Sequence, residues 1–248
     1  MITVPIIATT VNQARLQAGK INHLVELRLD HIKALDEKKL VQLVGIVKKK
    51  IITIRRKDEG GHFKGSEKKR VQLIKKAIDL GAEYVDIELR TVGIEDIIKN
   101  KGKTKIIVSF HNFKKTDNRE IGEVYNKINK LNSDIIKIVT YANSIDDNLD
   151  IFNLIKKAVK DKKKIVAVCM GEKGEISRIL APRLGAYMTF ACIDGKESAP
   201  GQMSLDNMIN LYRVNRLNSK TKIYGLVGNP VSKSKGIIIH NKAFAKDR

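Results

Sequence analysis

Short apolar runs alternate with amphipathic stretches along most of this chain. Eight of the runs have the length and the β-branched content of buried strands: 2–8, 24–29, 51–55, 84–89, 105–110, 135–140, 164–169 and 187–193. Between them, apolar residues recur with the period of a helix, as at Leu40, Leu43, Val44 and Val47. The alternation predicts an α/β fold in which strands are followed by helices, the last of them over 204–217.

The number of repeats separates two parallel architectures. A doubly wound sheet is the rival, but it gives no reason for eight regular repeats, whereas a (β/α)8 TIM barrel requires them. A chain of 248 residues has a usual size for one such barrel. Residues 218–221 have the composition of a linker, and an apolar strand expected over 222–228 is superfluous to the barrel. We therefore predict a TIM barrel of residues 1–219 and a short C-terminal extension of residues 220–248.

Composition narrows the class of protein. The net charge of +21 is scattered in lysine pairs and triplets, and only 5% of the residues are aromatic, so specific nucleic-acid binding is not expected. No apolar run reaches the length of about 18 residues that a membrane helix needs, and a signal peptide is not expected at the N-terminus. Cys169 and Cys192 lie in apolar runs without the spacing of metal ligands. We expect a cytoplasmic protein without a metal site.

Lys137 lies in the middle of the apolar run 135–140. In a central strand its amine loses most of its hydration, which lowers the pKa of a lysine and makes it a nucleophile toward a carbonyl carbon. In an edge strand the same side chain would lie in solvent. The decision between these alternatives depends on the polar residues elsewhere in the chain.

Polar side chains stand where the predicted strands end, which is where barrel enzymes carry their chemistry. They are Glu26, Arg28, Arg55, Glu59, Asp86, Glu88, Ser109, His111, Arg178, Ser198 and Gln202. Each has a structural explanation of its own, as an ion pair, a turn or a loop. Together they would be costly unless they pair or bind a ligand. A desolvated amine beside an imidazole and arginines suits a carbonyl substrate that carries a carboxylate and reacts through a Schiff base.

These residues occur in ordered motifs that resemble one enzyme family, the type I 3-dehydroquinate dehydratases, over residues 1–217. The motifs are Glu26-Leu-Arg28-x-Asp30, Arg55 followed by Glu59-Gly-Gly, Ser109-Phe-His111-x-Phe113, Lys137, Ile-Ser-Arg178 and Ser198-Ala-Pro-Gly-Gln202. The resemblance implies a homodimeric lyase that dehydrates 3-dehydroquinate to 3-dehydroshikimate in the shikimate pathway. It also implies that no metal or cofactor is needed, because the lysine imine serves as the electron sink.

The resemblance assigns roles to the same residues. It implies that Lys137 forms the imine, that His111 is the general acid and base, and that Glu59 orients His111. Arg178 is implied to bind the substrate carboxylate. Ring hydroxyls and the pocket wall are assigned to Glu26, Arg28, Arg55, Ser198, Gln202, Phe113 and Met170. Val168 replaces a methionine that the family often has, and a first-strand hydroxyl contact is implied for Thr9 or Thr10.

The extension resembles a different enzyme. Residues 224–244, which include Asn229 and Ser234, are similar to the start of shikimate dehydrogenase. Only about 28 residues follow the linker, so the resemblance implies a partial segment of a bifunctional enzyme without dehydrogenase activity. Two rivals remain for the whole chain, an imine-forming aldolase that acts on a sugar phosphate and a non-enzymatic basic protein that binds nucleic acid.

Overall fold

Eight parallel strands form the centre of the computed structural model, which describes residues 1–46, 49–228 and 230–246. Val47 of the predicted helical stripe and Asn229 of the extension lie outside these ranges. The strands are β1 (Ile2–Ile6), β2 (Leu24–Arg28), β3 (Lys50–Thr53), β4 (Tyr84–Glu88), β5 (Lys105–His111), β6 (Ile135–Tyr141), β7 (Ile165–Met170) and β8 (Thr189–Phe190). Neighbours pair in the order β7-β6-β5-β4-β3-β2-β1-β8.

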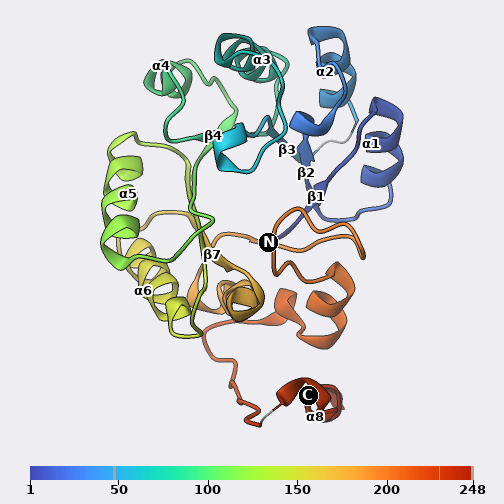
Figure 1. Cartoon of the computed structure of the whole chain (residues 1–248), viewed down its shortest axis with the longest axis vertical. Coiled ribbons are helices and arrows are strands. Elements are labelled where there is room, and N and C mark those ends of the chain that lie inside the picture. Colours follow the sequence, from blue (N-terminus) through green and yellow to red (C-terminus); the bar gives the residue numbers. More distant parts are fainter. Residues whose placement is uncertain (47–48, 229, 247–248) are drawn as a thin grey trace.

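The ends of this sheet approach each other and nearly close it. β8 pairs with β1 through Ile2 and Thr189, and the Tyr187 amide donates to the carbonyl of Ile165 in β7 at 2.8 Å. Figure 1 shows helices placed around the strands as an outer ring. These helices are α1 (Val11–Ala18), α2 (Glu37–Val44), α3 (Glu67–Asp79), α4 (Ile94–Lys99), α5 (Asn118–Lys130), α6 (Asp147–Lys160) and α7 (Glu175–Leu180). The predicted (β/α)8 TIM barrel is confirmed.

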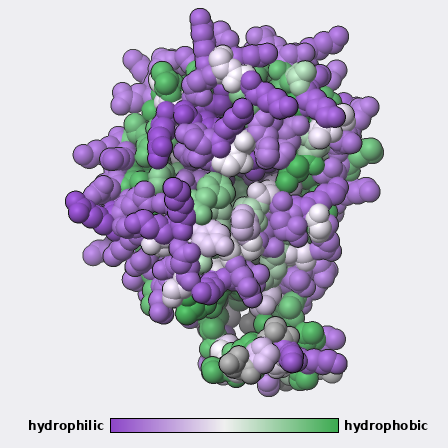
Figure 2. Space-filling model, in the orientation of Figure 1, coloured by the Kyte–Doolittle hydropathy of each residue, from purple (hydrophilic) through white to green (hydrophobic). Residues whose placement is uncertain are grey.

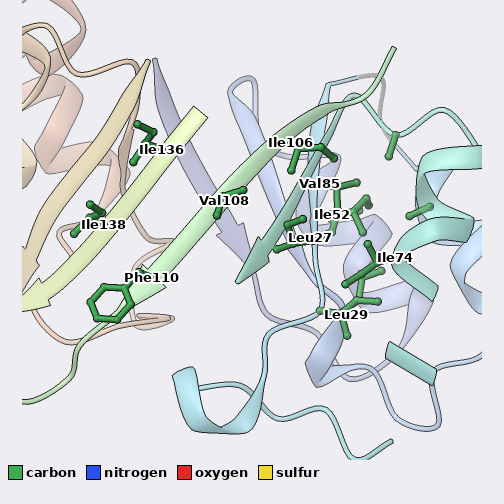
Figure 3. Packing of buried hydrophobic residues seen from close by; sticks show 14 of the residues in the cluster. Leu27, Leu29, Ile52, Ile74, Val85, Ile106, Val108, Phe110, Ile136 and Ile138 are labelled. Atoms are coloured by element: carbon green, nitrogen blue, oxygen red, sulfur yellow. The ribbon is translucent and has the colours of Figure 1, made fainter. Parts of the chain in front are cut away.

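Strand alternation divides the side chains between two environments. On β5, Ile106, Val108 and Phe110 belong to the large core between strands and helices, and Figure 3 shows them beside the equivalent side chains of neighbouring strands. The residues between them, Ile107 and Ser109, alternate to the other face, toward the barrel interior.

The inward face changes from apolar to polar along β2 to β6. At the N-terminal end of the barrel, Leu24, Ile51, Tyr84, Ile107, Ile135 and Val166 form a buried apolar cluster with Met188 and Phe190. Two residues further along the strands, the same face carries Glu26, Thr53, Asp86, Ser109 and Lys137, all of them buried. Strand alternation therefore places charged and polar side chains at the C-terminal end of the barrel interior, above an apolar base.

Three predicted elements differ in the structure. The predicted strand 187–193 is reduced to the two residues of β8. The predicted helix 204–217 is interrupted, because Arg213 adopts a left-handed conformation (φ 51°) between a π-helical turn, Asn207–Leu211, and a 3-10 turn, Val214–Arg216. The predicted strand 222–228 does not form, since the nearly closed barrel offers it no sheet edge to pair with.

Residues 220–228 and 230–246 lie on the outside of the barrel, and the second of these stretches ends in α8 (Gly236–Lys246). The Arg183 side chain donates to the carbonyl of Thr221 at 2.9 Å, and Tyr224 stacks on Phe244 with 5.2 Å between ring centroids. Figure 2 shows apolar side chains on this small lobe, in contrast to the largely hydrophilic barrel surface above it. In the described part of the chain, no helix combines the length and the apolar character needed to cross a membrane.

Candidate active site

One pocket at the C-terminal end of the barrel brings together all the side chains to which the sequence assigned a catalytic or binding role, except the hydroxyl contact implied for Thr9 or Thr10. The empty space between its walls, including the part open to solvent at the mouth, is about 500 Å³. The predicted residues that line it are Glu26, Arg28, Arg55, Glu59, His111, Phe113, Lys137, Met170, Arg178, Ser198 and Gln202. Gly60, Val139, Val168, Phe190 and Ala199 complete the wall. Thr9 and Thr10 are not part of it; Thr10 caps α1 by accepting from the Gln13 amide.

Lys137 lies on an interior strand and is buried, because β6 has β5 on one side and β7 on the other. Its amine contacts two carboxylates, Asp86 Oδ2 at 2.7 Å and Glu26 Oε1 at 3.6 Å. The Phe190 ring lies under the same nitrogen, with 4.5 Å from Nζ to the ring centroid. The edge-strand alternative is therefore wrong, and carboxylates replace the water that the amine loses.

Arg55 follows β3 and holds two buried carboxylates in place, one of which is Asp86. Its guanidinium contacts Asp86 at 3.0 Å, Glu88 at 3.0 Å and the Ser109 hydroxyl at 2.7 Å. Burial alone would raise the pKa of Asp86, but the charges of Arg55 and Lys137 outweigh burial and hold that pKa far below its ordinary value. Asp86 is therefore a fixed negative charge beside the lysine amine.

His111 and Glu59 form a second pair, which joins the end of β5 to the loop after β3. Glu59 Oε2 lies 2.9 Å from His111 Nδ1 and accepts the His111 backbone amide at 3.1 Å. Burial raises the pKa of Glu59 to about 7, partly opposed by Arg55 and reinforced by Glu88 and Asp86. Burial also holds the pKa of His111 well below its ordinary value, and the cations Arg55 and Lys137 lower it further. The imidazole is therefore neutral at pH 7 and can accept a proton.

Two glycines allow the Glu59 loop to reach His111. Gly60 has a left-handed backbone (φ 78°), and a β-carbon there would lie 2.5 Å from the Phe113 ring. A β-carbon on Gly61 would lie 2.0 Å from the backbone oxygen of Arg55, which cannot move without displacing the strand end. The Glu-Gly-Gly sequence is thus required by the close approach of this loop to β3 and to the residues after β5.

Arg178, on α7, is as deeply buried as Arg55 but differs in its partners. Among the described residues, the only hydrogen bond of its side chain runs from Nη2 to the Pro200 carbonyl at 3.3 Å. No carboxylate there forms an ion pair with the guanidinium, and Nε is buried without a partner. Burial lowers the pKa of Arg178 to about 10. A buried, unsatisfied guanidinium at a pocket wall is a receptor for a carboxylate.

The loop after β8 closes the same side of the pocket. The Gln202 side-chain oxygen accepts from the Ser198 amide at 2.6 Å and from the Ser198 hydroxyl at 3.0 Å. On the opposite side, Arg28 makes two 2.9 Å hydrogen bonds to Asp30, which also accepts the His62 amide. Both ends of the pocket rim therefore consist of polar side chains that fix one another.

Sequence reasoning assigned no role to two residues that touch Lys137. Asp86 was visible as a polar strand end, but its contact with an amine 51 positions away in the chain depends on the pairing of three strands. Phe190 looked like an ordinary core residue of the predicted last strand, and no local signal marked it. Within the described ranges, no cluster of three or more His, Cys, Asp or Glu side chains could hold a metal ion.

A buried lysine between carboxylates, a neutral histidine and an unpaired arginine at the mouth of a TIM barrel define an enzyme site for an oxo-acid. A family model described as type I 3-dehydroquinase matches residues 2–219. This chain belongs to the type I 3-dehydroquinase family.

Individual relatives agree with this assignment. The 3-dehydroquinate dehydratase of Methanocaldococcus jannaschii is 39% identical over 222 residues, which are 86% of this chain and 98% of the relative. A bifunctional 3-dehydroquinate dehydratase/shikimate dehydrogenase of Arabidopsis thaliana is 37% identical over 98% of this chain. The alignment spans only 42% of the length of that relative.

Solved structures share the fold. The 3-dehydroquinate dehydratase of Aquifex aeolicus has a TM-score of 0.72 at 29% identity, over 87% of this chain and 98% of the other. The enzyme of Geobacillus kaustophilus has a TM-score of 0.79 at 23% identity, over 86% and 90% of the two chains.

Proposed function

We propose that the pocket dehydrates 3-dehydroquinate to 3-dehydroshikimate through an imine on Lys137, a step of the shikimate pathway that leads to chorismate. One observation carries the proposal: a buried amine and a buried guanidinium without a carboxylate partner line the same pocket. The substrate has a ketone for the amine and a carboxylate for the guanidinium. Both enzyme groups therefore find their chemical complement in one small molecule.

The Lys137 amine attacks the C3 ketone after giving up a proton, and loss of water leaves a protonated imine. Positive charge remains at Nζ throughout the life of this intermediate. Asp86 and Glu26, 2.7 and 3.6 Å from that nitrogen, are already in place to stabilise the charge. The protonated imine draws electrons from C2 and makes its proton acidic, so no added cofactor is required.

His111 removes the C2 proton and gives a proton to the C1 hydroxyl as it leaves. Glu59 engages Nδ1, which leaves Nε2 as the ring nitrogen that accepts the proton. Removal of the proton from C2 gives an enamine, whose electrons expel the C1 hydroxyl as water. Hydrolysis of the remaining imine then releases 3-dehydroshikimate and restores the lysine.

The other pocket residues divide between binding and organisation. Arg178 binds the substrate carboxylate, and Ser198, Gln202, Glu26 and Arg28 contact ring hydroxyls. The guanidinium of Arg55 is occupied by Asp86, Glu88 and Ser109, so its contribution is the position of those groups. Phe113, Met170 and Phe190 form the apolar wall that excludes water from the imine.

Reduction of the imine tests this proposal directly. Protein mixed with 3-dehydroquinate and sodium borohydride is expected to gain the mass of one reduced ligand, located by peptide mapping on Lys137. Lys137→Met is expected to gain no adduct and to lose turnover. Lys105→Met, the same change at the opposite end of a barrel strand, serves as the matched control and should be labelled normally. An adduct on another lysine, or turnover by Lys137→Met, would refute the mechanism.

Three finer features are part of the same proposal. The extension 220–248 is a partial shikimate dehydrogenase-like segment, which is supported by an alignment with the bifunctional relative that continues past residue 219. The chain acts as a cytoplasmic homodimer. Sedimentation at micromolar concentration tests the dimer, and NADP-dependent reduction of 3-dehydroshikimate by the isolated chain would contradict the partial-segment assignment.

A further inference from the structure

Arg70 is a buried cation that does not line the pocket. It lies in the first turn of α3, on the outer ring of the barrel, and yet only 1% of its side chain is exposed. A helix residue at such a position is ordinarily apolar or directed to solvent, since a buried charge requires several compensating contacts. The contacts of Arg70 explain where its side chain goes.

All five N–H donors of Arg70 are satisfied. Nε and Nη2 donate to the two oxygens of Glu67 at 2.8 Å, and Nη2 also donates to the Thr91 hydroxyl at 2.8 Å. Nη1 donates to Glu88 Oε2 at 2.7 Å and to the Ile54 carbonyl at 3.0 Å. A guanidinium has five donors in a rigid plane, so this set of partners fixes its position completely.

Glu88 connects Arg70 to the pocket. It is the last residue of β4 and fully buried, and its second oxygen, Oε1, accepts from Arg55 at 3.0 Å and from the Arg56 amide at 3.1 Å. Arg55 in turn contacts Asp86, which contacts Lys137. Positive and negative groups therefore alternate from the outer helix to the reactive amine.

The same contacts hold the loop that carries Glu59. Arg70 binds the carbonyl of Ile54, and Glu88 binds the amide of Arg56, so both sides of Arg55 are attached to this network by the backbone. Glu59 follows three residues later. Displacement of Arg70 would move Arg55 and the Glu59 loop together.

We propose that Arg70 is a positioning residue for the dehydration, acting through Glu88 on Arg55 and on the loop that carries Glu59. The inference rests on the proposed function, because it concerns the same site. Arg70 also supplies the positive charge that balances Glu88. Three cations and three carboxylates form the buried network: Arg70, Arg55 and Lys137 with Glu88, Asp86 and Glu26.

Loss of the Arg70 charge should raise the pKa of Glu59. Glu88 already raises the pKa of Glu59, and without Arg70 its negative charge acts on Glu59 with less compensation. The charged or titratable groups that face Glu59 are Arg55 from the segment after β3, Asp86 and Glu88 from β4, His111 from β5, and Asp58 from its own turn. Of these, Glu88 is the one that Arg70 contacts.

The test compares kcat and the pH profile of kcat/KM across four variants. Arg70→Met is expected to lower kcat by roughly 10- to 100-fold through misplacement of the loop. It should also move the acid limb of the profile, where kcat/KM falls as Glu59 becomes protonated, to higher pH. Arg70→Lys keeps the charge and should restore the limb, though not the full rate. The double variant Arg70→Met/Glu88→Gln removes both charges and should place the limb at or below its wild-type position.

Glu67→Gln is the matched control, since Glu67 binds Arg70 from the partly exposed outer side and has no contact with Glu88. It should leave the limb unchanged. If Arg70→Met does not fold, Arg70→Lys still tests the role of Arg70, because it should lower kcat while the limb stays at its wild-type pH; a wild-type kcat for Arg70→Lys would refute the positioning role. Wild-type protein that fails to dehydrate 3-dehydroquinate would refute the proposed function. An active wild type, with Arg70→Met matching it in kcat and pH profile, would refute only the role of Arg70.

Discussion

The two sides of the pocket bury arginines to the same depth but give them different partners. On one side, formed by β2 to β6, Arg55 is 3% exposed and contacts Asp86, Glu88 and Ser109. On the other, formed by α7 and residues 198–202, Arg178 is 2% exposed and bonds only to a backbone carbonyl among the described residues. We refer to these as the paired side and the open side.

The difference separates charges that hold the site together from a charge that is left available for a ligand. Charges on the paired side are neutralised within the protein, so they can hold Lys137 and stabilise its iminium without rearrangement. The open side leaves one buried charge without a carboxylate partner, which costs stability in the free protein. Under the proposed function, the substrate carboxylate would supply that partner. Burial alone therefore does not distinguish the two arginines. The absence of a carboxylate partner is what singles out Arg178 as the one proposed to bind substrate.

The largest predicted effect concerns proton transfer on the paired side. His111→Ala is expected to lower turnover by roughly 10²- to 10⁴-fold, because it removes the general acid and base while leaving the amine in place. The imine should still form, so borohydride would trap more adduct on Lys137 than in the wild type. Stopped-flow turnover and intact mass give both readings. Nearly full turnover would contradict the acid/base assignment.

Replacement of each arginine by methionine, in separate variants, tests the comparison itself. Arg55→Met leaves Asp86 and Glu88 without their shared cation and is expected to reduce the free energy of unfolding by about 3–5 kcal/mol. Arg178→Met removes a charge without a carboxylate partner, so its unfolding free energy should equal or exceed that of the wild type. Its kcat/KM should nevertheless fall by roughly 10²-fold through loss of a charged hydrogen bond. Urea titration and steady-state kinetics measure the two quantities; equal destabilisation would remove the distinction between the sides.

Glu59 should give activity and stability opposite dependences on pH. Its pKa is raised to about 7 by burial, and His111 needs the carboxylate form of Glu59 as the acceptor at Nδ1. As pH falls through 7, Glu59 becomes protonated and kcat/KM should decline. Glu59→Gln should be slow at every pH and lack this limb. A wild-type profile that is flat between pH 6 and 8 would contradict the assignment.

The stability effect of Glu59 has the reverse sign. The ordinary pKa of a glutamate is 4.5, so between pH 4.5 and about 7 the folded protein binds more protons at this group than the unfolded chain does. The free energy of unfolding should therefore fall as pH rises through that window. Above it, Glu59→Gln should be more stable than the wild type by about 1–3 kcal/mol, measured by urea titration at pH 8. The catalytic loop would then be a place where function reduces stability.

The smallest predicted effect lies outside both sides of the pocket. Deletion of residues 220–248 should leave turnover within about twofold, because the described part of this segment lies on the barrel exterior and contributes nothing to the pocket lining. Solubility should improve, since Val227 and Ile239 are 97% and 61% exposed. Turnover assays and light scattering provide the test. A large loss of turnover would indicate that the segment supports the site or a dimer.

The sequence by itself determined the repeating elements and the inventory of the pocket. The order of apolar runs predicted eight parallel strands, and strand alternation placed Glu26 and Arg28 on one face. The sequence also selected eleven of the sixteen residues that line the pocket. These features depend on a residue and its near neighbours, because side-chain direction in a strand repeats every two residues.

Only the tertiary structure decided which charges meet. Lys137 reaches Asp86 because β5 lies between β6 and β4, with Ser109 opposite Lys137 and Glu88 opposite Ser109. The lack of a carboxylate partner for Arg178 is a property of all the groups around it and is not encoded in any local motif. The strand expected over 222–228 failed for the same kind of reason, since a strand needs a free sheet edge as well as a β-forming sequence. Pairing, burial and the pKa values that follow from them are long-range properties, so they appear only when the chain is folded.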